Sequence, residues 1–286
     1  MKLPRPARAD LALVFVTIIW GCSFSIVKSA LAQVSPLLFI TLRFWVATVV
    51  TVVSMPRAIV RIPRQTWVQG SILAGYLLSG FLFQTLGLRA TTPSKSAFIT
   101  SLSVPLVPVL GFLLFGHRPR IQTLIGVALA SIGLGFLTLE SFEVSISVGD
   151  ALTLLCAVAF ALHILYIGRY VPSADYRQLV ILQIGLSAVV SGALTPLLET
   201  PFLVWDARFA VYLAITGILA TALGFYVQNR AQRLTTANRA ALIFSLEPVF
   251  AVLFAYALLG HTLTFKETLG GILVLSGVLT SELRKD

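Results

Sequence analysis

Long apolar segments and short polar connections alternate along the whole chain. A helix that crosses a hydrocarbon core roughly 30 Å thick needs about 20 mostly apolar residues, and this criterion, with cuts at proline, glycine and clustered charges, predicts ten spans. They cover residues 11–31, 37–55, 67–87, 95–116, 121–139, 149–170, 177–197, 209–231, 238–259 and 266–281. The apolar runs are continuous, whereas the strands of a membrane barrel alternate over about ten residues. We therefore predict an all-α integral membrane protein with ten transmembrane helices.

The composition supports the bilayer as the environment of the chain. Apolar residues make up 57% and charged residues 11% of the sequence, whereas about 25% of the residues in soluble domains are charged. The mean hydropathy is +0.94. So few charges cannot cover a water-exposed surface of this size. The composition excludes a soluble globule, a disordered tail and a nucleic-acid-binding protein, and it makes lipid the expected partner.

The basic residues predict the orientation of the spans. With the N-terminus in the cytoplasm, 15 of the 21 Lys and Arg residues lie on the cytoplasmic side, four lie outside and two lie within spans. Because cytoplasmic loops are enriched in Lys and Arg, we expect both termini inside a bacterial inner (plasma) membrane. The basic start also fits a secretory signal, but the apolar run from Leu11 to Val27 exceeds the usual 7–15 residues, so we expect it to be retained.

The second half of the chain repeats the first half. Shifted by 144 positions, residues 84–133 are identical to residues 228–277 at 14 of 50 places, and in the earlier spans the offset is about 140. A repeat of this kind is the signature of a duplicated architecture. The equivalent pairs include Gln84 and Gln228, Arg89 and Arg233, Lys95 and Arg239, Asp10 and Asp150, and Trp20 and Phe160.

Five spans in each half imply that the two halves are inverted. Since five is odd, the second half starts on the opposite face of the membrane, and a pseudo-two-fold axis lies in the membrane plane. We expect one repeat over residues 1–140 and the other over 141–286. Inverted repeats are typical of secondary transporters, whose site lies near the midplane between the repeats.

Four segments carry a resemblance to a known family. They are Trp20-Gly21-Cys22-Ser23-Phe24, Leu42-Arg43-Phe44, Arg233 to Ala241 (RLTTANRAA) and Leu246-Glu247-Pro248-Val249. The chain resembles the drug/metabolite transporter superfamily, and within it the ten-span EamA family of bacterial exporters. The resemblance covers essentially the whole chain. It departs from the family at Gly116-His117 and Gly260-His261, where the family usually has Gly-Glu.

The resemblance implies export of amino acids and related metabolites, aromatic amino acids among them. It also implies that the fourth and ninth spans act as gates at the pseudo-symmetry axis. Prolines in these two spans remove backbone donors and kink helices, and we interpret them as hinges. They are Pro105, Pro108 and Pro248.

Helical spacing selects the side chains that we expect to line a central, aromatic-rich cavity. Aromatic rings would pack the apolar part of a metabolite, and hydroxyl and amide groups would bind its polar end. The alternative is ordinary helix packing with small and polar residues at the contacts. The candidates for substrate binding are Trp20, Ser23, Phe24, Tyr76, Ser79, Phe83, Gln84, Ser101, Phe160, His163, Tyr226 and Gln228.

Three charges lie within the predicted spans, where charge is costly and indicates function by default. Glu247, in the middle of the ninth span, is either a titrating carboxylate or a structural partner, with Arg43 as one possible mate. Lys28 and Arg43 either reach the cavity or extend toward the membrane surface.

We expect a secondary transporter of small metabolites that works by alternating access. An intramembrane enzyme would need a motif such as His-Glu-x-x-His or Gly-x-Ser-x-Gly, and a channel would need a filter or a charged ring; neither pattern occurs in the sequence. Cys22 and Cys156 both lie in spans, so we expect no metal, cofactor or disulfide. Ten spans can enclose a route alone, which allows a monomer.

The predicted orientation can be tested with a reporter fused to the C-terminus. An even number of spans returns the C-terminus to the cytoplasm, so a phosphatase reporter that needs the periplasm is expected to stay inactive while a fluorescent reporter is bright. An active phosphatase at this position would contradict the orientation.

Overall fold

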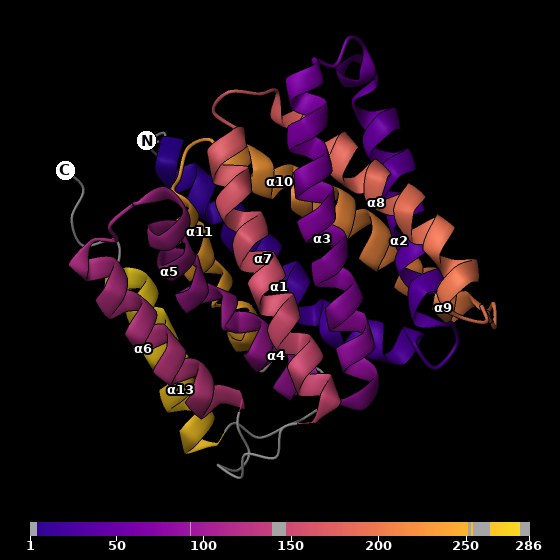
Figure 1. Cartoon of the computed structure of the whole chain (residues 1–286). Helices are drawn as coiled ribbons and strands as arrows, with labels where there is room; N and C mark the ends of the chain where they lie inside the picture. Colours follow the sequence, from indigo (N-terminus) through magenta and orange to yellow (C-terminus); the bar gives the residue numbers. More distant parts are fainter. Residues whose placement is uncertain (1–4, 92, 139–146, 251–252, 254–263, 281–286) are drawn as a thin grey trace.

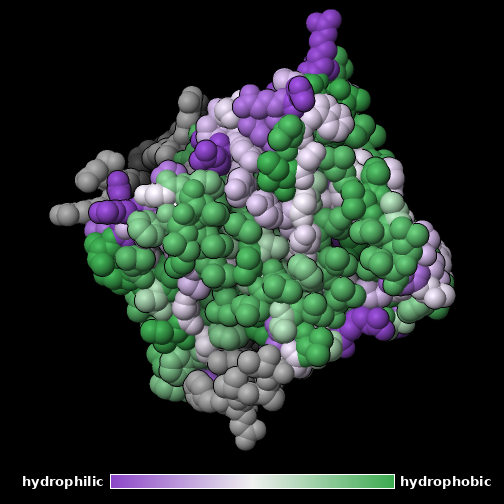
Figure 2. Space-filling view, viewed as in Figure 1, coloured by the Kyte–Doolittle hydropathy of each residue, from purple (hydrophilic) through white to green (hydrophobic). Residues whose placement is uncertain are grey.

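The structure, a computed structural model, describes residues 5–91, 93–138, 147–250, 253 and 264–280, and these residues fold into packed helices (Figure 1). Seven helical stretches of the described residues are long and apolar enough to cross a membrane, and shorter helices complete the bundle. Apolar side chains gather in a broad band across the face seen in Figure 2, and polar ones gather above it. The predicted fold class, an all-α membrane protein of two inverted five-helix repeats, is confirmed.

The helices follow the predicted spans closely. The first half contains α1 (Arg5–Ala30), α2 (Pro36–Ser54), the short 3-10 helix η1 (Pro56–Ile59), α3 (Arg64–Ala90), α4 (Pro93–Ser101), α5 (Ser103–Phe115) and α6 (Ile121–Thr138). The second half contains α7 (Val148–Tyr170), α8 (Tyr176–Leu198), α9 (Ala207–Ala214), the π-helix η2 (Ile215–Leu223), α10 (Gly224–Ala231), α11 (Ala237–Phe244) and α13 (Phe265–Thr280). Most of the second part of the predicted ninth span, 238–259, lies outside the described residues.

Three of the predicted spans are not single α-helices. The fourth is divided between α4 and α5, the eighth widens into the π-helix η2, and the ninth is interrupted after α11. The criterion used for the prediction counts apolar residues along the sequence. It cannot detect such breaks, because the backbone can leave the α-helical conformation without any change in how apolar the segment is. Proline explains two of the breaks, as described below.

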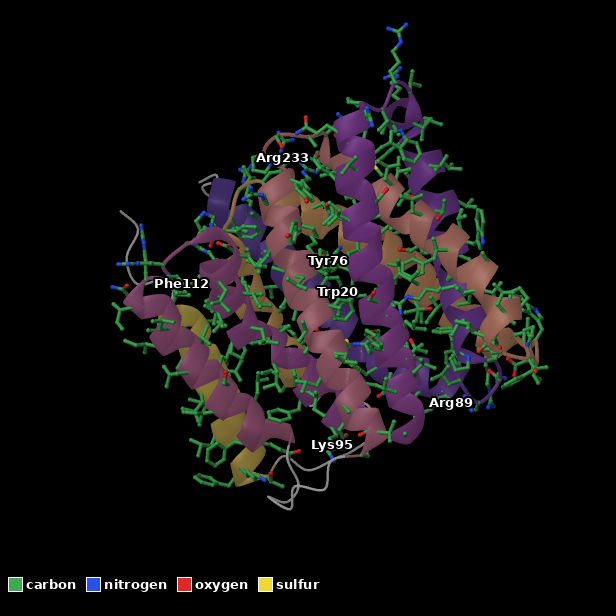
Figure 3. All side chains as sticks on the ribbon, in the orientation of Figure 1. Trp20, Tyr76, Arg89, Lys95, Phe112 and Arg233 are labelled. Atoms are coloured by element: carbon green, nitrogen blue, oxygen red, sulfur yellow. The ribbon has the colours of Figure 1, made fainter. Side chains whose placement is uncertain are left out.

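The inversion is visible in the positions of equivalent residues. Figure 3 shows Arg89 and Lys95 at one end of the molecule and Arg233, the repeat partner of Arg89, at the other. The N-terminus lies at the end that carries Arg233. A shared sequence segment therefore occurs once at each end of the bundle, as a two-fold axis across the bundle requires.

The last helices of the two repeats, α6 and α13, lie side by side (Figure 1) and touch at equivalent glycines. A Cβ atom at Gly133 would lie 2.6 Å from the carbonyl oxygen of Gly270, and one at Gly277 would lie 2.5 Å from that of Gly126. The two contacts are equivalent, because Gly133 corresponds to Gly277 and Gly126 to Gly270 under the 144-residue offset. Small residues are used in this way where membrane helices approach closely.

Two ion pairs are also related by the repeat. Asp150, near the start of α7, binds Lys95 of α4 with Oδ2 and Nζ 2.7 Å apart. Asp10 of α1 binds Arg239 of α11. In each pair, the first helix of one repeat supplies the acid and the fourth helix of the other supplies the base. The pairs therefore fasten the two repeats together at opposite ends of the bundle.

The connections between repeats at the Lys95 end are held by carboxylates. Glu199, after α8, accepts hydrogen bonds from the backbone nitrogens of Leu37 (3.1 Å) and Leu38 (2.8 Å) at the start of α2. Asp206 caps α9 by accepting from the backbone nitrogen of Phe209 at 2.7 Å. Hydrogen bonding of this kind lowers the pKa of the Asp206 carboxyl below its ordinary value.

The α6–α13 contact predicts a stability difference between glycines. Gly133→Ala places a methyl group against backbone atoms of α13, and such overpacking typically costs about 1–3 kcal/mol, so we expect a lower unfolding temperature in detergent. Gly192→Ala is the matched control, since its Cβ would meet its nearest neighbour at an ordinary 3.6 Å. Equal unfolding temperatures for the two variants would contradict this contact.

Candidate functional site

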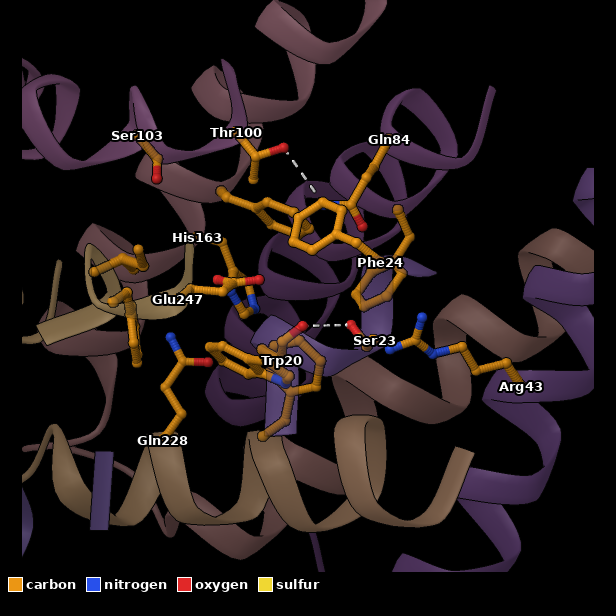
Figure 4. Close-up of a pocket in the computed structure, with 15 residues that line it drawn as sticks. Trp20, Ser23, Phe24, Arg43, Gln84, Thr100, Ser103, His163, Gln228 and Glu247 are labelled. Atoms are coloured by element: carbon orange, nitrogen blue, oxygen red, sulfur yellow. Dashed lines mark hydrogen bonds between the residues drawn. The ribbon is translucent and has the colours of Figure 1, made fainter. Parts of the chain in front are cut away.

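A cavity lies between the two repeats near the middle of the bundle (Figure 4). It contains about 600 Å³ of space without protein atoms, including the part open to solvent. Helices α1 to α5 line it from the first repeat, and α7, α10, α11 and the residues after α11 line it from the second. The lining residues are Trp20, Ser23, Phe24, Arg43, Phe81, Gln84, Thr100, Ser103, Phe160, His163, Ile164, Phe225, Gln228, Phe244 and Glu247.

The lining is almost symmetric under the repeat. Seven pairs of equivalent residues account for 14 of the 15 positions: Trp20 and Phe160, Ser23 and His163, Phe24 and Ile164, Phe81 and Phe225, Gln84 and Gln228, Thr100 and Phe244, and Ser103 and Glu247. Only Arg43 lacks an equivalent in the lining, because the residue at the same offset, Gln183, lies behind His163. The cavity therefore surrounds the pseudo-two-fold axis.

Aromatic rings form the apolar part of the wall. Trp20 packs against Phe225 and Phe244 with ring centroids 5.5 and 5.1 Å apart, and Phe81 packs against Phe160 at 5.6 Å. The indole nitrogen of Trp20 donates a hydrogen bond of 2.7 Å to the carbonyl oxygen of Ala220 in the π-helix η2. This bond fixes the plane of the ring, and π-helical turns of this kind are frequent at functional sites.

The two charged groups of the lining do not pair with each other. Arg43 is 3% exposed, donates through Nε to Thr221 Oγ1 at 2.7 Å, and lies over the ring of Phe81. Among the described residues, no ion pair or hydrogen bond to the Glu247 carboxylate occurs, so Arg43 is not its mate. Figure 4 shows the two side chains well apart, with Glu247 near Trp20 and Arg43 beyond Ser23. The cavity therefore has a guanidinium group on one part of its wall and a carboxyl group on another.

Polar groups behind the wall orient some lining residues. Nε2 of His163 lies 2.6 Å from Oε1 of Gln183, whose amide nitrogen donates to Asn229. Because an amide oxygen only accepts, Nε2 carries the proton in this contact. Gln228 is 1% exposed, and its Oε1 has no hydrogen-bond partner within the described part of the chain. Gln228 therefore keeps an unused acceptor at the wall.

Both helix breaks border the cavity at nearly equivalent places, one residue apart under the 144-residue offset. Pro105 has no N–H to bond the carbonyl of Ser101, where α4 ends, and Pro248 has none for Phe244, where α11 ends. Backbone that leaves the helix is tolerated at membrane depth only where it is buried in protein or lines a cavity. Pro108, in contrast, lies inside α5.

Seven of the twelve predicted binding residues line the cavity, as do Arg43 and Glu247. The others lie elsewhere: the Tyr76 ring stacks near Tyr166, the Tyr226 hydroxyl lies 3.3 Å from that of Tyr176, and the Ser101 hydroxyl donates to the Ala97 carbonyl. Ser79 and Phe83 are also absent from the lining.

Lys28 donates to the Leu88 and Thr91 carbonyls at the C-terminal end of α3, where a cation is favoured by the helix dipole.

The prediction missed six lining residues. They are Phe81, Thr100, Ser103, Ile164, Phe225 and Phe244. On α3, Gln84 lines the cavity as predicted, but the rest of that face is set by Phe81. Helical spacing could not show this, because one side of a membrane helix meets lipid and apolar residues occur all around it. The repeat offset contains the missing signal: Phe81 and Phe225 are equivalent, and each lies three residues before a repeated glutamine.

The comparison with protein families decides the identity. The sequence model of the EamA-like transporter family matches this chain twice, over residues 7–139 and over residues 147–282. The chain belongs to the EamA-like transporter family. The family resemblance stated from the sequence is thus confirmed, and the protein is a multi-pass membrane transporter.

Relatives of this EamA-like transporter align with nearly its full length. An uncharacterized transporter of Archaeoglobus fulgidus is 33% identical over 278 residues, which are 96% of this chain and 86% of that protein. A probable amino-acid metabolite efflux pump of Salmonella typhimurium is 27% identical, with 92% and 91% of the two chains aligned. A solved crystal structure superimposes with a TM-score of 0.81 at 18% identity and covers 96% of this chain and 98% of that one, which supports the same fold.

The bond between Trp20 and Ala220 can be tested in this EamA-like transporter by Trp20→Phe. Phenylalanine keeps an aromatic ring but removes the donor, so we expect a loss of unfolding free energy of about 1 kcal/mol, measured by thermal unfolding in detergent. Trp45→Phe is the control, because Trp45 is 45% exposed on the surface of the bundle. An equal loss in both variants would show that the indole bond contributes nothing specific.

Proposed function

We propose that this transporter exports amino acids and related metabolites, aromatic amino acids among them, across the bacterial inner membrane by alternating access. The observation that carries the proposal is that two ionisable side chains, Arg43 and Glu247, and several aromatic rings line the same cavity. An amino acid has a carboxylate and an ammonium group at one end and a side chain at the other, and the cavity offers a partner for each part.

The guanidinium of Arg43 is the natural partner for a substrate carboxylate. Arg43 is held by Thr221 and by the Phe81 ring, and an arginine presents a planar fork of donors that matches a carboxylate. Glu247 provides an anion for the ammonium group, and the amide oxygen of Gln228 provides a further acceptor. Aromatic rings on both repeats pack the side chain of the substrate.

The symmetry of the site supports alternating access. We propose that the repeats 1–140 and 141–286 rock about the cavity and that the breaks before Pro105 and Pro248 act as hinges. Opening toward one face would separate the ion pair at that end, Asp150 with Lys95 or Asp10 with Arg239. The carboxylate of each pair is largely buried in this structure, so opening at that end would have to bring water to both charges to offset their separation.

Substrate and mechanism can be tested together by counterflow with purified protein in proteoliposomes. Vesicles loaded with an unlabelled amino acid should accumulate the labelled one transiently, with saturable kinetics. Non-saturable flux without counterflow would indicate a channel, and a changed compound inside the vesicles would indicate an enzyme. A screen that includes aromatic, aliphatic and charged amino acids defines the range.

The charged groups predict selective losses in the same assay. Arg43→Gln and Glu247→Gln each remove one charge-assisted hydrogen bond worth about 1.5–3 kcal/mol, so we expect kcat/KM to fall roughly 10- to 100-fold. Glu267→Gln is the control, since Glu267 lies in the first turn of α13 outside the cavity. Unchanged kcat/KM in both cavity variants would contradict the proposed binding of a zwitterion.

A further inference from the structure

Two aromatic residues of the cavity rest on glycines of the opposite repeat. Trp20 of α1 lies against Gly224, the first residue of α10, and Phe160 of α7 lies against Gly80 of α3. The two contacts are equivalent, since Gly80 and Gly224 are related by the 144-residue offset and the two rings by the 140-residue offset. The same arrangement therefore occurs on each side of the axis.

Neither contact leaves room for a methyl group. A Cβ atom at Gly224 would lie 2.9 Å from Nε1 and 3.3 Å from Cε2 of Trp20. A Cβ atom at Gly80 would lie 2.7 Å from Cδ1 and 3.0 Å from Cζ of Phe160. Carbon atoms do not approach this closely, so any side chain at either glycine must displace the ring.

A displaced ring has room to move toward the cavity. Phe225 and Phe244 flank Trp20 with centroids 5.5 and 5.1 Å away, and Phe81 lies edge-on to Phe160 at 5.6 Å. Since protein interiors are close-packed, these neighbours block the sideways routes. The open space lies on the cavity side, where both rings are part of the wall.

We propose that Gly80 and Gly224 determine the size of substrate that this transporter accepts. The missing side chains let the rings of Phe160 and Trp20 retract into the opposite helix, which leaves width for a second aromatic ring between them. The inference rests on the proposed function, because it concerns the side-chain end of the same site. The glycines touch no substrate and act through the rings.

The test compares transport of large and small amino acids by Gly80→Ala and Gly224→Ala. We expect kcat/KM for tryptophan and phenylalanine to fall about 10-fold or more, the usual effect of one excess methyl group in a tight pocket, with alanine and serine changed less than about 3-fold. Gly75→Ala on the same helix is the matched control, because its Cβ would have nothing within 4 Å. Retained transport of small substrates also demonstrates that the variants fold.

A second substitution should restore the large substrates. Phe160→Leu in the Gly80→Ala background removes ring atoms at the site of the clash and is expected to recover most of the loss for tryptophan. An equal loss for all substrates, or no loss in either glycine variant, would overturn the proposal. Failure of Phe160→Leu to restore tryptophan would overturn the role assigned to the ring.

A chemical probe separates this inference from the proposed function. In a chain with Cys22 and Cys156 replaced by alanine, Ser103→Cys places a thiol in the cavity wall. Gly80→Ala should slow its reaction with a bulky aromatic maleimide far more than with a small methanethiosulfonate. If the wild type transports no amino acid while this size effect is present, only the proposed substrate is wrong. If the two reagents are affected equally, the glycines do not set the width.

Discussion

The bilayer gives backbone N–H and C=O groups no water to bond with, and this constraint governs the whole structure. It forces the chain into helices that satisfy their own hydrogen bonds, and it confines irregular backbone to protected places. The breaks after Ser101 and Phe244 and the π-helix η2 all lie beside the cavity. Trp20 and Arg43 bind to residues of η2. The least regular backbone of the molecule is thus also the part that shapes its site.

Duplication explains the geometry of the cavity, and divergence explains its chemistry. Equivalent residues occupy equivalent walls, so the rings and the glutamines recur on both sides of the axis. The charged groups do not recur: Glu247 is equivalent to Ser103, and Arg43 to Gln183. A perfectly symmetric site would present the same group twice and could not orient a substrate with two different ends. The residues that differ between the repeats make the two sides of the cavity chemically different, so a substrate with two different ends can bind in one orientation.

Contacts between the repeats are of two kinds. The α6–α13 contact brings backbone atoms together at glycines without any intervening side chain, and such packing has little freedom to slide. The links at the two ends are ion pairs whose carboxylates are largely buried, and separating such a pair is costly unless water reaches both charges. Opening at either end under the proposed mechanism therefore requires water to enter at that end.

The sequence alone determined the helical membrane fold, the inverted repeat and the family, because apolar length, helix period and duplication are properties of the chain itself. It also identified Trp20, Gln84 and Gln228 as cavity residues. Only the tertiary structure decided which face of each helix turns inward, because lipid accepts the same apolar side chains as the protein interior. For this reason Tyr76 and Phe83 were expected in the cavity in place of Phe81. The separation of Arg43 from Glu247 and the fit of Trp20 against Gly224 depend on distances between distant segments, which no local pattern contains.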